Sequence, residues 1–472
     1  MEEWAKTWLD KQRNKGEKGI EIKRFSNSYY VYRSTTYWDK ELKKRRKKSI
    51  YLGRLDIEKG LIKSSKRVIS NFRPRSIKQY GNAAILHSVL GDLQSLLKNE
   101  FEDVWQEIYA LSLVRVFGYV PLKRVRSIWE KLYDPLKLNP SLSPGTLSKV
   151  LKVVGTDYEA QNAIFEELSH IGNQFVYDLS VVFTRSEGIN FAELGYNKDK
   201  FYIPQINLAL FYSVDKGLPT MIRALPGSVR DITSLYNSVR DANMEGKILI
   251  LDRGFFSMKT IDFLLDKSVA FVLPAKRNSK LYKTRIHLTR HFFYRDRLIK
   301  LGKKKLGRYF LYLFEDTTLK VEEEKTLYKR IDEEKISNNE LKNMLNHAGR
   351  IIITSDLDIE GEEIFLMYKQ RGGVEKLFDM YKNILHADKM YLQDDESIFG
   401  HLFTSFISLY AYCKIEFAIK KKNLLHKLSP LDVLEEFAKV YMIKDGEREI
   451  ISEVPKKVAE LDRVLGFNVF PK

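Results

Sequence analysis

Residues 205–225 read QINLALFYSVDKGLPTMIRAL, and this stretch decides the fold predicted for the chain. Its first part, 205–213, is an apolar, β-rich run of strand length. Asp215, Lys216 and Gly217 follow as turn residues, and 218–225 is a second apolar run. Two such runs joined by a Gly-containing turn predict a β-hairpin.

The segments around this hairpin predict an α/β domain. FVYDLSVVF at 175–183 predicts a strand before the hairpin. After it, the pattern predicts a helix over 231–242, a strand over 247–251, a helix over 258–266 and a strand over 269–274. Three antiparallel strands followed by alternating helices and strands are the element order of an RNase H-like α/β fold. In that fold the first and fourth strands lie side by side.

Each of these two strands carries an aspartate. Asp178 lies within the first strand, where an unpaired carboxylate would be costly. Asp252 follows the fourth strand directly, before Gly254. Taken alone, Asp178 is equally consistent with an edge strand facing solvent, and Asp252 with a turn or a helix cap. If both strands pair as predicted, the two carboxylates meet at one edge of the sheet.

A third acid comes from residues 368–382, YKQRGGVEKLFDMYK. In an α-helix Tyr368, Arg371, Glu375 and Lys382 fall within roughly 60° of one another, on one stripe. A carboxylate with cations above and below suits a metal ion that holds a phosphodiester. Taken alone, the pair Arg371–Glu375 is also typical of an ordinary solvated helix. Asp379 is the backup third carboxylate.

These motifs together resemble the DDE transposases of prokaryotic insertion sequences, in the family with a Tyr-(2)-Arg-(3)-Glu-(6)-Lys signature. The four residues of the stripe match that signature without a gap. GYNKDK (195–200) and LPGSVRD (225–231) are similar to further segments of the family, and YWDKELKK (37–44) and YLGRLD (51–56) more weakly so. The chain departs from the family at Gly372-Gly373-Val374, where an aromatic and a large residue are usual. Two glycines predict a kink there, or a helix that begins near Val374.

The resemblance implies a cut-and-paste DNA transposase. Asp178, Asp252 and Glu375 would bind Mg²⁺, with Mn²⁺ able to substitute, and would catalyse cleavage and strand transfer. Tyr368, Arg371 and Lys382 would bind DNA phosphates. Double-stranded DNA, as transposon ends and as target, would be the partner, held by a homodimer in a synaptic complex. Two alternatives stay open: a metal-dependent nuclease without strand transfer, and a DNA-binding derivative that has lost catalysis.

Composition agrees with a polyanionic partner. The 472 residues carry a net charge of +18, with a pI near 9.4. The single cysteine, Cys413, excludes intrachain disulfides and Cys-cluster zinc sites. The first residues show no signal-peptide pattern, and the apolar stretch 402–418 contains Lys414 and Glu416, which predicts a buried helix and no membrane partner. The expected location is the cytoplasm, in association with the nucleoid.

The predicted organisation interrupts the catalytic core. We predict a basic N-terminal β region (1–70), a helical DNA-binding region (71–170), the core in two parts (171–275 and 350–425), a mostly β insertion domain (276–349) and a helical C-terminal tail (426–472). Two basic groups are predicted to contact DNA: the basic run, Lys43, Lys44, Arg45, Arg46, Lys47 and Lys48, and the insertion group, Arg295, Arg297, Lys303, Lys304 and Lys305. A solvated hairpin tip and a charged hairpin exterior are the plainer readings of these two groups.

Overall fold

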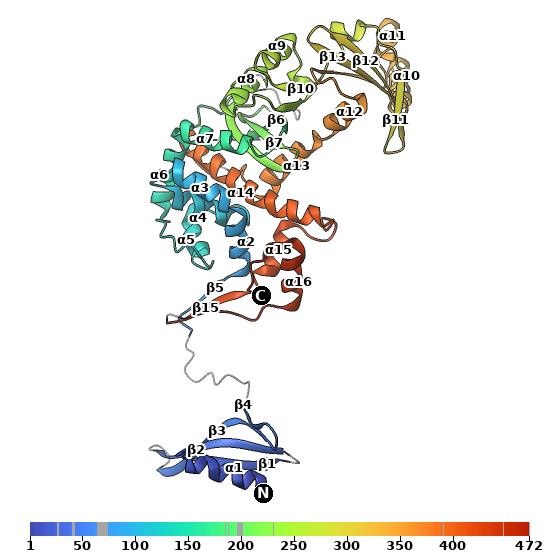
Figure 1. Ribbon diagram of the computed structural model, residues 1–472. Helices are drawn as coiled ribbons and strands as arrows, with labels where there is room; N and C mark the ends of the chain where they lie inside the picture. The colour runs from blue at the N-terminus through green and yellow to red at the C-terminus, as the bar shows by residue number, and fades with distance from the viewer. Residues whose placement is uncertain are drawn as a thin grey trace. The chain divides into compact units, whose positions relative to one another are not determined.

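A computed structural model of the chain describes residues 1–25, 28–39, 43–63, 74–184, 186, 188–195, 202–229, 231–389, 391–446 and 448–471. The family-like segment GYNKDK lies outside these residues except for its Gly195, as does Arg230 of LPGSVRD. The described residues form two compact units, 1–74 and 75–472 (Figure 1).

The smaller unit is one helix packed on an antiparallel sheet. It consists of α1 (Glu3–Asn14), β1 (Ile20–Phe25), β2 (Ser28–Asp39), β3 (Lys44–Asp56) and β4 (Gly60–Lys63), with the strands in sequence order. Ala5 and Leu9 of α1 are buried against Ile20, Val31 and Leu55, so the unit has its own hydrophobic core. The prediction of strands is confirmed, but the helix was not predicted.

The basic run extends from the turn between β2 and β3 into the adjoining end of that hairpin. Lys43 is in a turn with φ 46°, and Lys44 to Lys48 begin β3, paired with β2 from Asp39 to Thr35. Alternating side chains of a strand point to opposite faces, so these cations spread over both faces of a two-stranded ribbon. All of them are exposed, and Lys47 and Arg46 contact Glu21 and Asp39.

The larger unit is built around one mixed sheet, which has nine strands among the described residues (Figure 1). The strands are β6 (Gln174–Phe183), β7 (Gln205–Ser213), β8 (Leu218–Pro226), β9 (Ile248–Leu251), β10 (Ala270–Pro274), β11 (Arg290–Tyr294), β12 (Arg297–Leu306), β13 (Tyr309–Asp316) and β14 (Arg350–Ser355). Their order is β11-β12-β13-β14-β10-β9-β6-β7-β8. The first strand, β6, pairs in parallel with the fourth, β9, as predicted, and β9 pairs in parallel with β10.

The predicted insertion is not a separate β domain. Its strands β11, β12 and β13 extend the core sheet, because β13 pairs with β14, which pairs with β10. The physical reason is in β13, whose residues Tyr309 to Glu315 are all buried. A strand that is apolar on both faces belongs in the middle of a sheet. The segment also contains 3₁₀ turn η2 (Lys280–Lys283) and two helices, α10 (Thr317–Asp332) and α11 (Asn338–Leu345), so it is not mostly β.

Helices cover the sheet and continue below it (Figure 1). The sheet helices are α8 (Asp231–Asp241), 3₁₀ turn η1 (Arg253–Phe255), α9 (Met258–Asp266), α12 (Gly361–Lys369), α13 (Gly372–Asp379) and π-helical turn η3 (Met380–Ile384). The helical body is α2 (Gly81–Val89), α3 (Gly91–Glu100), α4 (Trp105–Arg115), α5 (Leu122–Trp129), α6 (Pro144–Thr156), α7 (Tyr158–Ser169), α14 (Asp395–Lys421), α15 (Pro430–Phe437) and α16 (Lys456–Leu465).

Helix α14 is the centre of the helical body. It crosses α6 so closely that a Cβ on Gly400 would lie 1.9 Å from the backbone oxygen of Leu151. Within the described residues, α14 is the one helix long and apolar enough to cross a membrane, and 78% of its apolar window is buried inside the protein. The helices of 81–169 share this core with the sheet, so they do not pack as an independent domain.

The C-terminal tail is mixed rather than helical. Between α15 and α16 it forms the hairpin β15 (Tyr441–Asp445) and β16 (Arg448–Ile451). Strand β15 also pairs with β5 (Ser76–Gln79), far away in sequence. In this pairing Met442 lies opposite Lys78 and Ile443 opposite Ile77.

Candidate active site

The register of the sheet brings the two aspartates together. In the parallel pair β6–β9, Tyr177 lies opposite Leu251. The next residues along the two strands are Asp178 and Asp252, so they occupy the following position of the same ladder. Neighbouring strands are about 4.8 Å apart. The prediction that these two carboxylates meet is confirmed by this register.

Asp178 does not lie on an edge strand, and the side chain of Asp252 does not cap a helix. Asp178 belongs to a strand with neighbours on both sides, because β6 also pairs with β7. It is therefore not on an edge strand. Asp252 precedes turn η1 but makes no side-chain cap hydrogen bond there, and α9 is capped by Ser257. Its carboxylate remains available to the site.

The segment that carries the third acid is a broken helix. Helix α12 ends at Lys369, α13 begins at Gly372, and Gln370 and Arg371 between them keep right-handed helical angles. The predicted interruption at the glycines is therefore a local break, after which the chain continues as a helix.

The two glycines differ in what surrounds them. A Cβ on Gly372 would meet nothing within 4 Å, whereas one on Gly373 would lie 2.6 Å from the ring of Tyr212 in β7. Gly373 thus lets α13 lie directly against the sheet. This close approach brings Glu375, one half-turn further on, to the strand edge where the aspartates lie.

Arg371 joins the three acids, which we call the carboxylate triad (Asp178, Asp252 and Glu375). Its Nη1 lies 3.6 Å from Asp178 Oδ2 and 3.5 Å from Asp252 Oδ1. Its Nη2 donates a hydrogen bond to Glu375 Oε1 at 3.1 Å. Burial alone would lower the pKa of Arg371, but Asp252, Tyr368, Asp178 and Glu375 together raise it. The guanidinium therefore stays charged among three carboxylates.

The other two signature residues flank this cluster. Tyr368 is half-buried beside Arg371, Asp252 and Arg253, and burial raises the pKa of its phenol. Lys382 belongs to π turn η3, where its Nζ donates hydrogen bonds to Ser180 Oγ at 2.7 Å and to Val181 O at 2.6 Å. Ser180 lies on the same face of β6 as Asp178, about 7 Å along the strand.

Lys382 lies beside the other signature residues, on the sheet. It belongs to the π turn that follows α13, and its hydrogen bonds attach it to β6. The structure brings Tyr368, Arg371 and the carboxylate triad together, and places Lys382 next to them, on the backbone of β6. Asp379, the backup carboxylate, accepts a hydrogen bond from Asn383 at 2.6 Å and makes no described contact with Arg371.

The donor chemistry of the triad fits a divalent metal ion. Carboxylate oxygens are the ligands that Mg²⁺ and Mn²⁺ prefer. In the described part of the chain, no three His, Cys, Asp or Glu side chains are close enough together to hold a metal ion. In the triad a guanidinium lies among the carboxylates and supplies the positive charge. The three residues would hold a metal once that side chain moved aside.

The insertion group divides into two arginines near α12 and three lysines on β12. Burial lowers the pKa of Lys369 in α12, and Arg297 and Arg295, near the turn between β11 and β12, lower it further. Arg297 also pairs with Asp316 at 3.2 Å. Lys369 was missed in the sequence, because a lysine on a helix next to Tyr368 has no distinguishing pattern.

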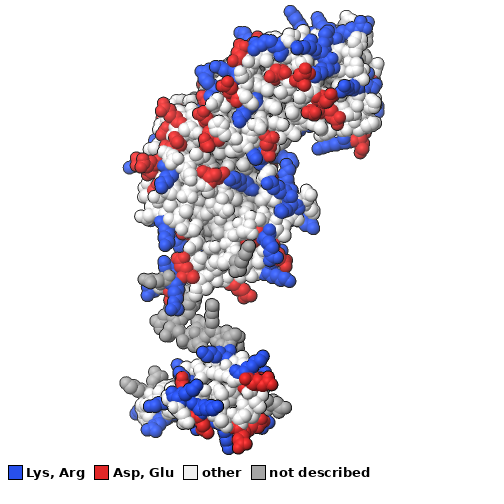
Figure 2. Space-filling view, in the orientation of Figure 1, with Lys and Arg blue, Asp and Glu red and all other residues white. Residues whose placement is uncertain are grey.

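The lysines of β12 are engaged within the protein. Lys303 pairs with Asp358 and lies 4.7 Å above the ring of Phe310. Lys304 donates to the backbone oxygen of Arg285 at 3.3 Å, and Lys305 lies 5.6 Å above the Phe310 ring. Figure 2 shows many Lys and Arg side chains at the end of the larger unit that is formed by β11 to β13, interspersed with acidic residues. DNA binding by the insertion group stays a prediction.

Comparison with known proteins agrees with this geometry. A family model described as "Transposase DDE domain" matches residues 173–411, which include the carboxylate triad, β6 to β14 and most of α14. The chain belongs to this transposase family. The matched residues span half of the chain, from just before β6 to a point within α14.

One solved structure is similar over most of the chain. It is the cryo-EM structure of the piggyBac transposase synaptic complex with hairpin DNA, at 12% sequence identity, with 83% of this chain and 86% of that chain covered and a TM-score of 0.39. None of the curated proteins compared matches the chain.

Proposed function

We propose that this transposase cuts DNA at transposon ends and joins the freed ends to target DNA, with the carboxylate triad as its catalytic centre. The observation that supports this most directly is the convergence of three carboxylates from β6, β9 and α13 on one guanidinium. A site that gathers three acids and already contains a cation is suited to divalent metals and phosphates.

The proposed chemistry uses no covalent bond to the protein. In cleavage, a water oxygen attacks phosphorus, the bond to the 3′-oxygen breaks, and the 3′-oxygen leaves as a hydroxyl. In strand transfer, that 3′-hydroxyl attacks a target phosphodiester and releases a target 3′-hydroxyl. Two Mg²⁺ ions held by the triad, or Mn²⁺ in their place, would supply Lewis-acid stabilisation of the attacking and leaving oxygens.

The protein's own residues would position the phosphates. Once a metal ion balances the triad, Arg371 is free to turn toward a phosphate oxygen without leaving buried charge uncompensated. Tyr368 can donate its phenolic hydrogen because its raised pKa keeps it protonated. Lys382 fixes the segment after Glu375 to β6, and its charge lies on the same face as Asp178.

A cleavage assay tests the proposal directly. The probe is the DNA that flanks the reading frame on both sides, radiolabelled and incubated with the full chain and Mg²⁺. We expect nicks at two inverted-repeat boundaries, and joining of a pre-cleaved 3′-hydroxyl end to plasmid DNA. Cleavage without joining would support the nuclease alternative. Binding without cleavage in Mg²⁺ or Mn²⁺ would support the inactive derivative.

The assembly and the location belong to the same proposal. We infer that a homodimer holds two ends in a synaptic complex, and that the protein works in the cytoplasm at the nucleoid. Molecular mass in solution with and without end DNA, by light scattering, tests the first of these. A monomer on paired ends would contradict it.

A further inference from the structure

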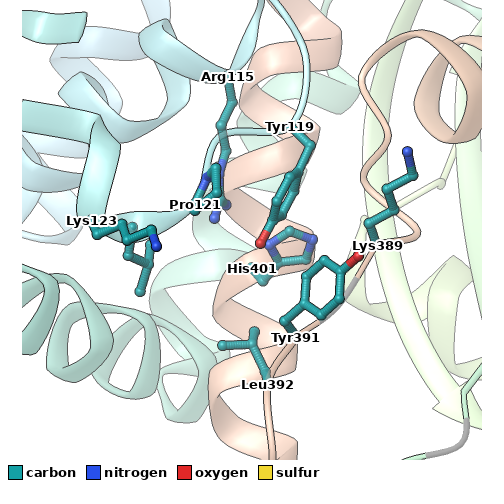
Figure 3. A pocket seen from close by; sticks show the side chains of 9 residues that line it. Arg115, Tyr119, Pro121, Lys123, Lys389, Tyr391, Leu392 and His401 are labelled. Atoms are coloured by element: carbon teal, nitrogen blue, oxygen red, sulfur yellow. The ribbon is translucent and has the colours of Figure 1, made fainter. Parts of the chain in front are cut away.

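A polar pocket lies in the helical body, away from the carboxylate triad. Its volume is about 260 Å³, and it is the pocket drawn in Figure 3. Its polar lining residues are Arg115, Tyr119, Lys123, Lys389, Tyr391 and His401. They come from two distant parts of the sequence, residues 115–123 in α4 and α5 and residues 389–401 up to the first turns of α14.

Arg115 is the unusual residue of this pocket. It is only 5% exposed, and its Nε has no hydrogen-bond partner in the described residues. Its Nη1 donates to Thr404 Oγ1 at 2.9 Å. Within the described part of the chain it forms no ion pair with a carboxylate, and burial lowers the pKa of its guanidinium to about 10. A buried guanidinium without a counter-ion is costly, so an anion in the pocket would stabilise it.

The other polar groups of the pocket suit an anion. Figure 3 shows Lys123 and the hydroxyl of Tyr119 pointing toward the same space as the end of Arg115, while Lys389 runs along the edge. His401 hydrogen-bonds with Ala387 O at 2.9 Å, and burial lowers its pKa to about 3, so its ring is neutral. Two cations and a phenol thus face the cavity, and its lining residues include no carboxylate.

The residues around the pocket indicate which class of anion it would bind. Next to the pocket, α5 presents Lys123, Arg124 and Arg126 to solvent. Tyr391 is 79% exposed at the rim and its ring lies 5.6 Å from that of Tyr119, so an aromatic surface is available to a sugar or base. A cavity of about 260 Å³ accommodates a phosphate and its attached sugar.

We propose that this pocket binds a phosphate group of DNA, with Arg115 and Lys123 as its ligands. The site is distinct from the carboxylate triad, but the two are joined by one short segment. Tyr381, six residues after Glu375, is fully buried near Arg115 and donates to Leu402 O at 3.2 Å. A phosphate in the pocket would neutralise Arg115 directly behind the catalytic helix. The choice of DNA as the source rests on the proposed function, whereas phosphate binding itself does not.

The first experiment measures inorganic phosphate alone. The full chain is titrated by calorimetry, and its thermal midpoint is followed with and without phosphate. Arg115→Met keeps the side-chain volume and removes the uncompensated charge, so the variant without phosphate should be at least as stable as the parent. It should lose at least about tenfold in phosphate affinity, because a charge-assisted hydrogen bond is removed. Lys123→Gln, on the surface of α5, should also weaken binding, and Lys98→Gln on α3 is the matched control.

The second experiment identifies the source of the phosphate. End DNA at saturation should exclude inorganic phosphate from the pocket, and Lys123→Gln should reduce the salt dependence of DNA binding by about one phosphate contact. Phosphate that binds equally well beside bound DNA would overturn DNA as the source. Equal phosphate affinity in both pocket variants and the control would overturn the pocket itself. Loss of cleavage in these variants would change neither of the two phosphate-binding results. Failure of the proposed function can therefore be distinguished from failure of the phosphate pocket.

Discussion

Replacing Arg371 with alanine should make the metal-free protein less stable and its affinity for Mg²⁺ higher. In the structure this guanidinium is the cation shared by the carboxylate triad. Without it, three carboxylates repel one another, and a divalent ion has no competitor for them. The substitution should therefore lower the stability of the metal-free protein and increase the stabilisation that Mg²⁺ provides.

The magnitude follows from the contacts. Two unit charges at about 4 Å attract by about 1 kcal/mol in water and more where water is excluded. The side chains of Arg371 and Asp178 are 24% and 20% exposed, but those of Asp252 and Glu375 are 40% and 60% exposed, so solvent screening weakens the latter two pairs. We expect a total loss of about 1–3 kcal/mol without metal. Because Arg371 and Mg²⁺ compete for the same carboxylates, removing this attraction corresponds to about a tenfold to hundredfold gain in Mg²⁺ affinity.

The assay requires neither DNA nor catalytic activity of the protein. Thermal unfolding of the full chain is followed across a Mg²⁺ titration, and bound Mn²⁺ is counted by electron paramagnetic resonance. Lys376→Ala is the charge-matched control, because Lys376 lies exposed on the same helix and acts on Glu416 instead of the triad. Identical metal affinity and identical stability for Arg371→Ala and the parent would refute the reasoning.

Four further predictions follow from the same structure. Alanine at any member of the carboxylate triad should abolish Mg²⁺-dependent cleavage and leave DNA binding intact in a gel-shift assay, while Asp379→Ala stays active. Gly372→Ala should raise the thermal midpoint, by removing up to about 1 kcal/mol of helix cost, whereas Gly373→Ala should lower both midpoint and activity by pressing on Tyr212. Deleting the basic run should weaken binding to end DNA and random DNA equally, and a flat salt dependence would contradict this. The pKa of His401 is lowered to about 3 in the folded state, below its ordinary value of 6.5, so stability is full above pH 6.5 and falls as pH drops toward 3. His401→Gln should flatten that slope in urea unfolding at several pH values.

The sheet could be predicted because its signal is local and periodic. Strand β7 and helix α9 have the bounds that the apolar runs predicted, and Asp178 and Asp252 followed from the order of the strands. The pairing of β10 with β14 could not be predicted, because it joins residues far apart in the sequence, such as Val272 and Ser355. Long-range pairing depends on which strands are left with open edges, and no sequence window contains that information.

The site was predictable in composition but not in detail. The contact between Arg371 and Glu375 could be predicted from their spacing, since residues four apart are neighbours on the surface of an α-helix. The hydrogen bonds of Lys382 to Ser180 and Val181 could not be predicted, because they join residues about 200 apart in the sequence. Arg115 was missed for a different reason. Among the apolar residues of α4 it has the pattern of a surface arginine, and only the packing of α14 against α4 makes it buried.

Arg371 explains how three carboxylates can share one sheet edge in the folded protein. Three carboxylates at one sheet edge would destabilise the fold in proportion to their burial, and the chain could avoid this only by exposing them or by supplying a cation. It supplies the cation from the residue directly before α13, four positions before Glu375, so the acid and its counter-charge lie one helical turn apart. Gly373 completes the arrangement: because it has no Cβ, the backbone of α13 can lie against Tyr212, and this close approach holds Arg371 and Glu375 over the strands that lead to the two aspartates.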